Sequence, residues 1–431
     1  MNCNCQFIQV VGRCSFCGPA LKGLHLDNRR YYGLDALRGG MMMLGIILHA
    51  CMLYLAEPPV RYPFPTDRNT AYVFDVALAF IHSFRMPTFF VLAGFFTSLL
   101  IEKRGLRGTY SNRAKRILAP LAAGVVTILP LTGLFMVTFM LGARYGTHDF
   151  IPSFDAVQTF KQELIAQGFP IGNPTLGHLW FLYYLCFFYL LIPLCDFLVR
   201  YSMRYEDQVK RWLVSPALPM AFAILTAASL WPFQGGMIFM EYTFLMPHVP
   251  ALLYFALFFV LGYIFHHYPV FLSALARNVL FWTVLAVILF PLSLLASHYD
   301  AGAPGANFAP HLGAVLAQGL CTWVLIYFFL GCALRFFDHE SPWIIYVSQS
   351  AYWVFLVHLP LVFLAGWWLL PFDLSATFKF LLVCGFTSVV AFATFHYWVQ
   401  KCWISDFLYG RRFDLDWPWR QSGISRPPLQ T

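Results

Sequence analysis

Three ionisable residues lie within one otherwise apolar stretch, GLDALRGGMMMLGIILHACMLYL, which runs from Gly33 to Leu55. Arg38 and His49 are eleven residues apart, so on a helix they lie on one face, about 16 Å apart along the axis. Asp35 precedes Arg38 by one turn and can form an ion pair with it. Arg38 can reach an aqueous interface by extending its side chain, but His49 lies too deep in the stretch. A polar group held there indicates a functional site, and the alternative is a neutral imidazole that bridges two helices.

A second polar group occurs in FDVALAFIHSFRMPTFFVLAGFF, which begins at Phe74. Asp75 and His82 are two helical turns apart and Arg85 follows by one more turn, so the three side chains share a broad helix face. An arginine within an apolar stretch requires an anion or several carbonyl oxygens as its partner. Asp75 would be that partner in a purely structural role, whereas a phosphate or carbonyl group of a substrate would make Arg85 a binding residue.

Six basic residues occupy the fourteen positions from Lys103 to Arg116, in EKRGLRGTYSNRAKRILAP. The tendency of cytoplasmic loops to carry positive charge accounts for Lys103 and Arg104, which adjoin an apolar stretch. The more distant Arg107, Arg113 and Arg116 are also suited to a phosphorylated ligand, because a guanidinium group matches the oxygens of a phosphate.

Histidines also occur in later apolar stretches. In GHLWFLYYL, His178 and Trp180 are expected at the outer membrane interface, where tryptophan is common, and His178 could line the mouth of an outward-facing cavity. In SQSAYWVFLVHLPLVF, His358 lies within an apolar helix. His396 and Tyr397, in the last apolar stretch, are further candidates.

Helices that cross a membrane have to position these side chains. Of the 431 residues, 59% are hydrophobic and 11% are charged, whereas a soluble domain has about 25% charged residues. Apolar runs of about 20 residues, the length that spans a bilayer as a helix, recur along the chain. The predicted fold is therefore an all-α polytopic membrane protein, a bundle of about ten transmembrane helices. Their approximate limits are 34–56, 72–101, 117–141, 178–200, 213–232, 249–266, 278–297, 311–335, 350–370 and 378–400. Pro87 is expected to kink the long second span.

The placement of lysine and arginine predicts the orientation of the chain. With a cytoplasmic N-terminus, the segments on the cytoplasmic side carry 21 of these residues and the outer segments carry 5. Because positive charge concentrates on the cytoplasmic side, both termini are expected there. The net charge of +8 then follows from membrane topology, and no nucleic-acid partner is expected. No cleavable signal peptide is expected either, because the first apolar run lacks a positive start and a small-residue cleavage site.

Three segments are expected along the chain: a cytoplasmic leader over 1–33, the transmembrane domain over 34–400, and a cytoplasmic interfacial tail over 401–431. The long outer segment, roughly 142–177, is expected to contain a short helix on the membrane surface. The leader has four cysteines that either bind zinc or belong to a reduced, flexible segment. These cysteines are Cys3, Cys5, Cys14 and Cys17.

The ordered set of motifs resembles the acyltransferase 3 family of membrane-bound O-acyltransferases. LDALRGGMMMLGIILHA looks like the family's signature first helix, and FRMPTFFVLAGFF, RAKRILAP, HLWFLYYL and YWVFLVHLPL follow in the family's order over roughly residues 30–400. Ala93 stands where the family motif FFxxSGF often has serine, so a role for that hydroxyl is in doubt. The resemblance is nearest to the branch that includes the periplasmic glucan succinyltransferase.

The resemblance implies a multi-pass enzyme of the bacterial cytoplasmic (inner) membrane. It would move an acetyl or succinyl group from cytoplasmic acyl-coenzyme A to a hydroxyl of a periplasmic or other extracytoplasmic glycan or glucan. Acyl-CoA would be the donor substrate, with no tightly bound cofactor and no metal in the site; the other partners would be the glycan and the lipid bilayer. His49 would act as general base toward the acceptor or carry the acyl group transiently, and Arg85 would stabilise the oxyanion.

The resemblance thus implies three groups of site residues. The catalytic group is His49, Arg85, Asp35 and His358. The donor-binding group is Arg38, Arg107, Arg113 and Arg116. The acceptor-side group is His178, Trp180, Asp75 and His82.

Two other classes of protein are compatible with these residues. A transporter could use His49, Asp75, His82 and His358 as a proton relay, although the sequence has no repeated halves. A b-type cytochrome could use two of the histidines as axial haem ligands. Solute uptake without acyl transfer would identify the transporter, and a haem absorption spectrum the cytochrome. The sequence does not determine the oligomeric state, the acyl group or the acceptor.

Overall fold

The computed structural model describes residues 30–58, 65–167, 175–238, 247–300 and 307–420. Within these ranges the chain forms α-helices joined by short π-helical and 3₁₀ segments, and they include no β-strand. The predicted all-α class is therefore confirmed. The leader cysteines lie outside the described residues, so their two interpretations stay predictions.

Six helical stretches are long and apolar enough to cross a membrane. They are α1 (Tyr32–Cys51), the stretch Val73–Tyr145, α11 (Val279–Tyr299), α12 (Phe308–Phe336), α13 (Pro342–Leu369) and the stretch Ala376–Val399, which joins α14 (Ala376–Thr394) to the π-helical turn η5 (Phe395–Val399). The chain is thus a multi-pass membrane protein.

Three pairs of shorter helices raise the number of candidate spans to nine if each pair counts as one span. The pairs are α5 (Trp180–Leu190) with α6 (Ile192–Met203), α7 (Glu206–Leu213) with α8 (Leu218–Leu230), and α9 (Val249–Phe265) with α10 (Pro269–Arg277). They bend by 59°, 88° and 101° respectively. The predicted span 249–266 agrees with α9, and the predicted span 213–232 contains α8. The predicted span 178–200 is wrong as a single helix, because the chain breaks between α5 and α6.

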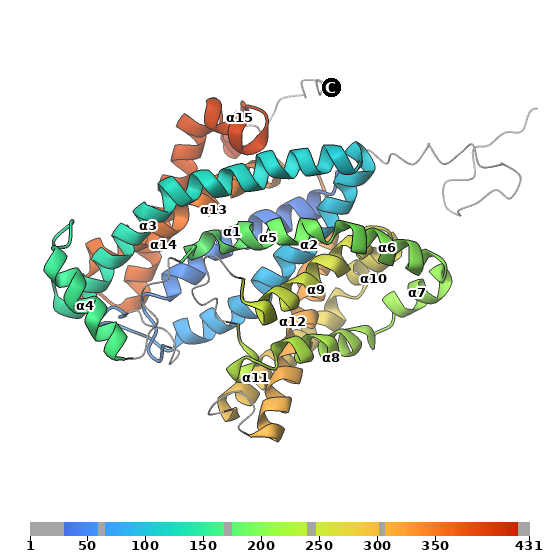
Figure 1. Ribbon diagram of the computed structural model, residues 1–431, viewed down its shortest axis with the longest axis horizontal. Coiled ribbons are helices and arrows are strands. Elements are labelled where there is room, and N and C mark those ends of the chain that lie inside the picture. Colours follow the sequence, from blue (N-terminus) through green and yellow to red (C-terminus); the bar gives the residue numbers. More distant parts are fainter. Residues whose placement is uncertain (1–29, 59–64, 168–174, 239–246, 301–306, 421–431) are drawn as a thin grey trace, which may run out of the picture. The chain divides into compact units, whose positions relative to one another are not determined.

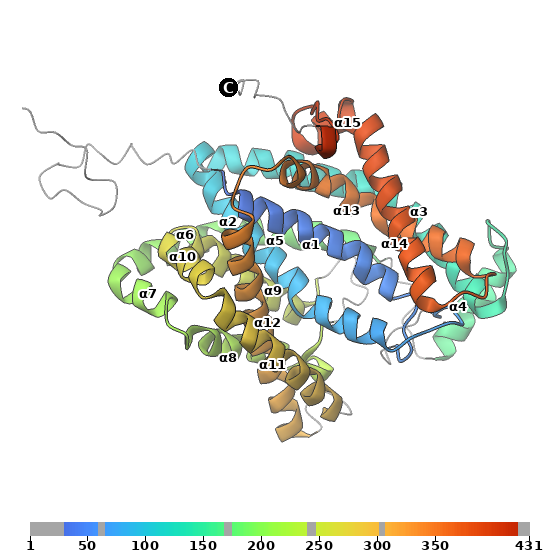
Figure 2. The ribbon, with the colours of Figure 1, turned by 180° about the vertical axis from the view of Figure 1, so that it is seen from behind.

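The stretch Val73–Tyr145 contains two of the predicted spans, α2 (Val73–Arg113) and α3 (Ala119–Tyr145), joined by the π-helical turn η2 (Ala114–Leu118). The chain doubles back between α2 and α3 (Figures 1 and 2). Gly105 has φ 66° and ψ 174° and interrupts the helix, in a backbone region that only glycine adopts readily. The expected loop at 102–116 is therefore helical on both sides of this one break.

Helix α1 packs against α2, α12, α13 and α14, and so lies inside the bundle. Helix α2 also packs along α9, where glycines allow the backbones to approach closely. A methyl group at Gly94 would overlap the Phe259 carbonyl, and one at Gly262 would overlap the Val91 carbonyl. This close crossing holds α2 at a fixed position against the second half of the chain.

The helices are tied together at their ends by polar contacts. Lys379 Nζ donates to both carboxylate oxygens of Asp67, at 3.0 and 2.8 Å, and the two side chains are 0% and 1% exposed. This buried ion pair joins the segment before α2 to α14. Beyond α3, the expected short helix is present as α4 (Phe154–Ala166), and α15 (Trp403–Tyr409) follows η5 near the end of the described chain.

Candidate active site

Two contacts fix α1 against α13 in a parallel arrangement. Near the start of both helices, Arg38 Nη2 donates to Ser348 Oγ over 2.8 Å. Further along, the ring centroids of His49 and His358 are 5.2 Å apart. These contacts are eleven residues apart on α1 and ten on α13, so each helix advances by about 15–16 Å between them. Arg38 and His49 therefore face the same helix, and the predicted ion pair of Arg38 with Asp35 is confirmed at 3.1 Å.

Arg85 is the buried cation of this region, with 5% of its surface exposed. Its Nε donates to the Met41 carbonyl over 2.9 Å, and its guanidinium carbon lies 5.7 Å from the centroid of the Phe89 ring. Gly45 on α1 makes room for the guanidinium, because a methyl group there would overlap Arg85 Nη2 and lie 3.5 Å from His358 Nε2. Arg85 and His358 thus meet at the same point of α1.

Arg85 has no carboxylate partner within the described part of the chain, so the structure does not support the alternative in which Asp75 is its structural partner. The Asp75 oxygens accept instead from the backbone N–H groups of Ala56 and Glu57, at 3.0 and 3.1 Å. Asp75 precedes Arg85 by ten residues, which is about 15 Å along α2 and too far for an ion pair. A guanidinium held in an apolar bundle without a counter-ion is suited to negative charge on a ligand.

Two histidines of the site have their hydrogen-bonding roles fixed by backbone carbonyls. His358 is 1% exposed, and its Nδ1 donates to the Phe355 carbonyl over 2.7 Å. His178 is 5% exposed, and its Nε2 donates to the Leu356 carbonyl over 3.1 Å. Because a carbonyl oxygen only accepts, these nitrogens carry the protons, and a neutral ring then has its lone pair on the other nitrogen.

Proline in α13 explains why His178 enters the cluster. Pro360 has no N–H, so the carbonyl of Leu356, four residues earlier, lacks its helical donor; His178 supplies one. The ring centroids of His178 and His358 are 5.2 Å apart. The side chain of His178 is thus buried between helices, and its expected place on the outer side of the membrane stays a prediction.

Pro87 has the same effect in α2. It leaves the carbonyl of Ser83 without a helical donor, and Thr322 Oγ1 of α12 donates to that oxygen over 2.8 Å. Arg85 lies two positions after Ser83 on α2, so this contact fixes the part of α2 that carries the buried cation. Sequence reasoning missed Thr322, although a proline within an apolar helix signals a carbonyl that needs a partner.

The other two acceptor-side candidates, His82 and Trp180, also have contacts within the described chain. His82 Nε2 donates to the Ile238 carbonyl over 2.6 Å. The Trp180 ring packs 5.2 Å from Phe255 and 5.4 Å from Tyr184, between ring centroids. These contacts place Trp180 inside an aromatic cluster of the bundle.

Two of the four predicted donor-binding arginines, Arg38 and Arg113, contact adjacent residues of α2. The Arg38 guanidinium carbon lies 5.5 Å from the Phe96 ring centroid, and Arg113 Nη2 donates to Thr97 Oγ1 over 3.2 Å. Phe96 lies on the same face of α2 as Phe89, two turns further along. Arg85 therefore lies at one end of this face of α2, and Arg38 and Arg113 lie at the other end. Ala93 lies between the two phenylalanines.

The other two predicted donor-binding arginines are placed differently. Arg116 Nη1 donates to the carbonyls of Asp406 and Phe407 at 2.5 and 2.8 Å. These carbonyls belong to the last turn of α15, where a cation interacts favourably with the carbonyl oxygens. Arg107 is exposed on α2. Arg116 thus holds α15, which was not expected from its sequence context.

No group of three or more His, Cys, Asp or Glu side chains in the described ranges is arranged to hold a metal ion. The site contains a buried guanidinium and three imidazoles. Two of the imidazoles have a lone pair whose position is fixed because the other ring nitrogen donates to a carbonyl. These groups can accept a proton, bind hydroxyl groups and stabilise a developing negative charge.

Comparison with known proteins agrees with this chemistry. Residues 31–398 match the acyltransferase 3 family, described as an acyltransferase domain. Proteins named glucans biosynthesis protein C from Escherichia coli strain SMS-3-5 and from Escherichia coli O139:H28 strain E24377A are each 26% identical over 398 residues, which covers 86% of this chain and 91% of theirs. No solved structure matches the chain. With a match to this family over most of its length, the chain belongs to the acyltransferase 3 family and is a membrane O-acyltransferase.

Proposed function

We propose that this enzyme moves an acyl group, acetyl or succinyl, from cytoplasmic acyl-CoA to a hydroxyl group of an extracytoplasmic glucan. The observation that carries this proposal is the buried Arg85 guanidinium, which lacks a carboxylate partner in the described residues and lies beside three imidazoles. A thioester carbonyl becomes negatively charged when a hydroxyl attacks it, and a preformed cation in an apolar site stabilises that charge strongly.

The donor phosphates are assigned to Arg38, whose guanidinium lies beside Phe96 of α2, and to Arg113, whose guanidinium donates to Thr97 of the same helix. Guanidinium groups bind phosphate oxygens with directed hydrogen bonds. Acyl-CoA carries its thioester at the end of a long arm, which would follow the face of α2 past Ala93 toward Arg85. The axial distance of about 16 Å from Arg38 to His49 gives the length that the arm has to cover.

In the proposed reaction, His49 removes the proton from the acceptor hydroxyl as its oxygen attacks the thioester carbonyl. Arg85 stabilises the oxyanion of the tetrahedral intermediate. The intermediate collapses by breaking the carbon–sulfur bond, and the coenzyme A thiolate leaves and takes from the His49 imidazolium the proton that came from the acceptor hydroxyl. The alternative route is attack by His49 itself, followed by transfer of the acyl group from the imidazole to the hydroxyl.

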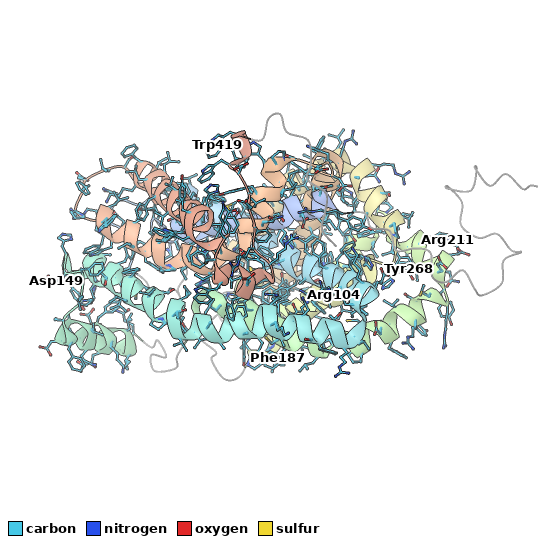
Figure 3. All side chains as sticks on the ribbon, turned by 90° about the horizontal axis from the view of Figure 1, so that it is seen from above. Arg104, Asp149, Phe187, Arg211, Tyr268 and Trp419 are labelled. Atoms are coloured by element: carbon cyan, nitrogen blue, oxygen red, sulfur yellow. The ribbon has the colours of Figure 1, made fainter. Side chains whose placement is uncertain are left out.

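The orientation of the chain supports a donor on the cytoplasmic side. Figure 3 places Asp149, which follows α3, at one end of the long axis, and Arg104 and Arg211 toward the other end. Arg104 and Arg211 lie in segments that carry much of the positive charge, and such segments face the cytoplasm. Counting α2 and α3 as two spans and each bent pair as one gives ten spans. We propose that they lie in the bacterial inner membrane with both termini in the cytoplasm. The acceptor class follows from the relatives' name, which refers to glucans.

The test is transfer by the purified, full-length protein in lipid vesicles. Radiolabelled acetyl-CoA or succinyl-CoA and a glucose oligosaccharide are supplied, and mass spectrometry locates an ester on the product. Formation of an O-acyl ester supports the proposal. Hydrolysis of the donor without ester formation, with either acyl group, would contradict it.

Two arginine variants test the donor site within the same assay. Arg113→Ala should weaken acyl-CoA binding by about 1.5–3 kcal/mol, the contribution of a hydrogen bond to a charged group. Arg116→Ala should leave donor affinity close to that of the wild type and lower the melting temperature, because Arg116 binds the carbonyls of α15. Equal losses of acyl-CoA affinity in both variants would show that Arg116 also binds a phosphate of the donor.

A further inference from the structure

The two carbonyl-fixed histidines leave a pair of hydrogen-bond acceptors inside the bundle. The free nitrogens are His358 Nε2 and His178 Nδ1, both buried and without a hydrogen-bond partner among the described residues. Their rings are 5.2 Å apart between centroids. A buried acceptor that lacks a donor is costly, so two such atoms on neighbouring rings need an explanation.

Donor groups on a ligand provide that explanation. With Nδ1–H and Nε2–H committed to the carbonyls of Phe355 and Leu356, the two rings offer only lone pairs to a ligand. A carboxylate or phosphate, which only accepts hydrogen bonds, cannot satisfy them. A metal cation is disfavoured because the Arg85 guanidinium and His358 Nε2 both lie against Gly45. Hydroxyl groups fit, since each can donate one hydrogen bond.

We propose that His358 Nε2 and His178 Nδ1 bind two hydroxyl groups of one sugar ring of the acceptor, beside the hydroxyl that is acylated. This inference rests on the proposed function, because it places the acceptor in the same site. The His49 ring lies 5.2 Å from that of His358, so a sugar held by the pair presents a neighbouring hydroxyl to His49. The pair is thus a specificity-determining subsite that selects which hydroxyl reacts.

The experiment combines sugar variants with protein variants. The acceptors are a glucose oligosaccharide and its monodeoxy derivatives, each lacking one hydroxyl of the reacting ring. The proteins are wild type, His178→Phe and His358→Phe, which keep an aromatic ring without a lone pair, and the conservative His178→Asn and His358→Gln. The side-chain oxygens of asparagine and glutamine can accept at about the Nδ1 and Nε2 positions respectively. Transfer and direct oligosaccharide binding to the full-length protein in detergent are both measured.

For the wild type, two of the monodeoxy acceptors should show kcat/KM lowered about 10- to 100-fold, because each leaves a buried acceptor unpaired. One of these penalties should vanish in His178→Phe and the other in His358→Phe, while acyl-CoA affinity stays unchanged. His178→Asn and His358→Gln should restore the penalties in part. Such non-additivity is the signature of a direct contact.

Penalties that are the same in wild type and in both phenylalanine variants would overturn the subsite. The subsite would also be overturned if His358→Phe lowered kcat but kept the full discrimination among the monodeoxy acceptors. That result would make His358 a catalytic base alone. If no transfer occurs even with wild type, the proposed function fails, and the binding measurement still decides the subsite by the same comparison. If a phenylalanine variant does not fold in detergent, the conservative variant at that position decides.

Discussion

Replacing Gly45 by alanine adds one methyl group where α1 passes the Arg85 guanidinium. The new carbon would overlap Arg85 Nη2 and lie 3.1 Å from Arg85 Cζ. Restoring an ordinary van der Waals contact requires the guanidinium to withdraw by about 1 Å. Because Nη2 is the far end of a flexible side chain, the cost in folding stability should stay below the ~1–3 kcal/mol that is typical of overpacking. The cost in rate should be larger, since a displacement of about 1 Å at a catalytic group lowers turnover by roughly 100-fold.

Gly40→Ala is the matched control, because it is the same substitution on the same helix. A methyl group at Gly40 would meet nothing within 4 Å. Transfer rate per folded molecule should therefore fall about 100-fold in Gly45→Ala and stay near wild type in Gly40→Ala, with similar melting temperatures in detergent. If Gly45→Ala transferred at the wild-type rate, the exact position of Arg85 would not matter, and its role in stabilising the oxyanion would be refuted.

Lys379→Met should lower the stability of the folded protein by about 3–5 kcal/mol, because it leaves the Asp67 carboxylate buried and unpaired; an unchanged melting temperature in detergent would show that Asp67 finds another partner. For topology, a cysteine introduced at Lys161 should react with a membrane-impermeant reagent added from outside, and one at Arg107 should react only after the membrane is opened. Outside labelling at Arg107 alone would reverse the assigned orientation.

Much of the fold could be predicted from apolar length, because a bilayer demands about 20 apolar residues per helix. The prediction of a loop at 102–116 was wrong because it also relied on apolar length. Hydropathy marks where a helix leaves the membrane, whereas Glu, Lys and Arg are good helix formers, so α2 continues beyond its apolar part until Gly105 interrupts it. The bend between α5 and α6 was also missed, since apolar residues continue across that break, through Leu190, Leu191 and Ile192.

Contacts within one helix of the site could be predicted, and contacts between helices could not. The spacing of Asp35, Arg38 and His49 correctly gave an ion pair and a shared face, because helical geometry fixes both. The burial of His178 depends on a carbonyl of another helix, freed by Pro360, and no local pattern connects two residues so far apart in the sequence.

The central claim is that His49 is the general base of acyl transfer, on the helix that also binds the donor through Arg38. The most direct measurement is the transfer rate per folded molecule of His49→Ala, taken together with its melting temperature and its affinity for acyl-CoA. Loss of a general base lowers the rate by about 100- to 10,000-fold, so we predict a folded protein that binds the donor with normal affinity and transfers at that reduced rate. A well-folded His49→Ala protein with near-normal turnover would contradict the claim.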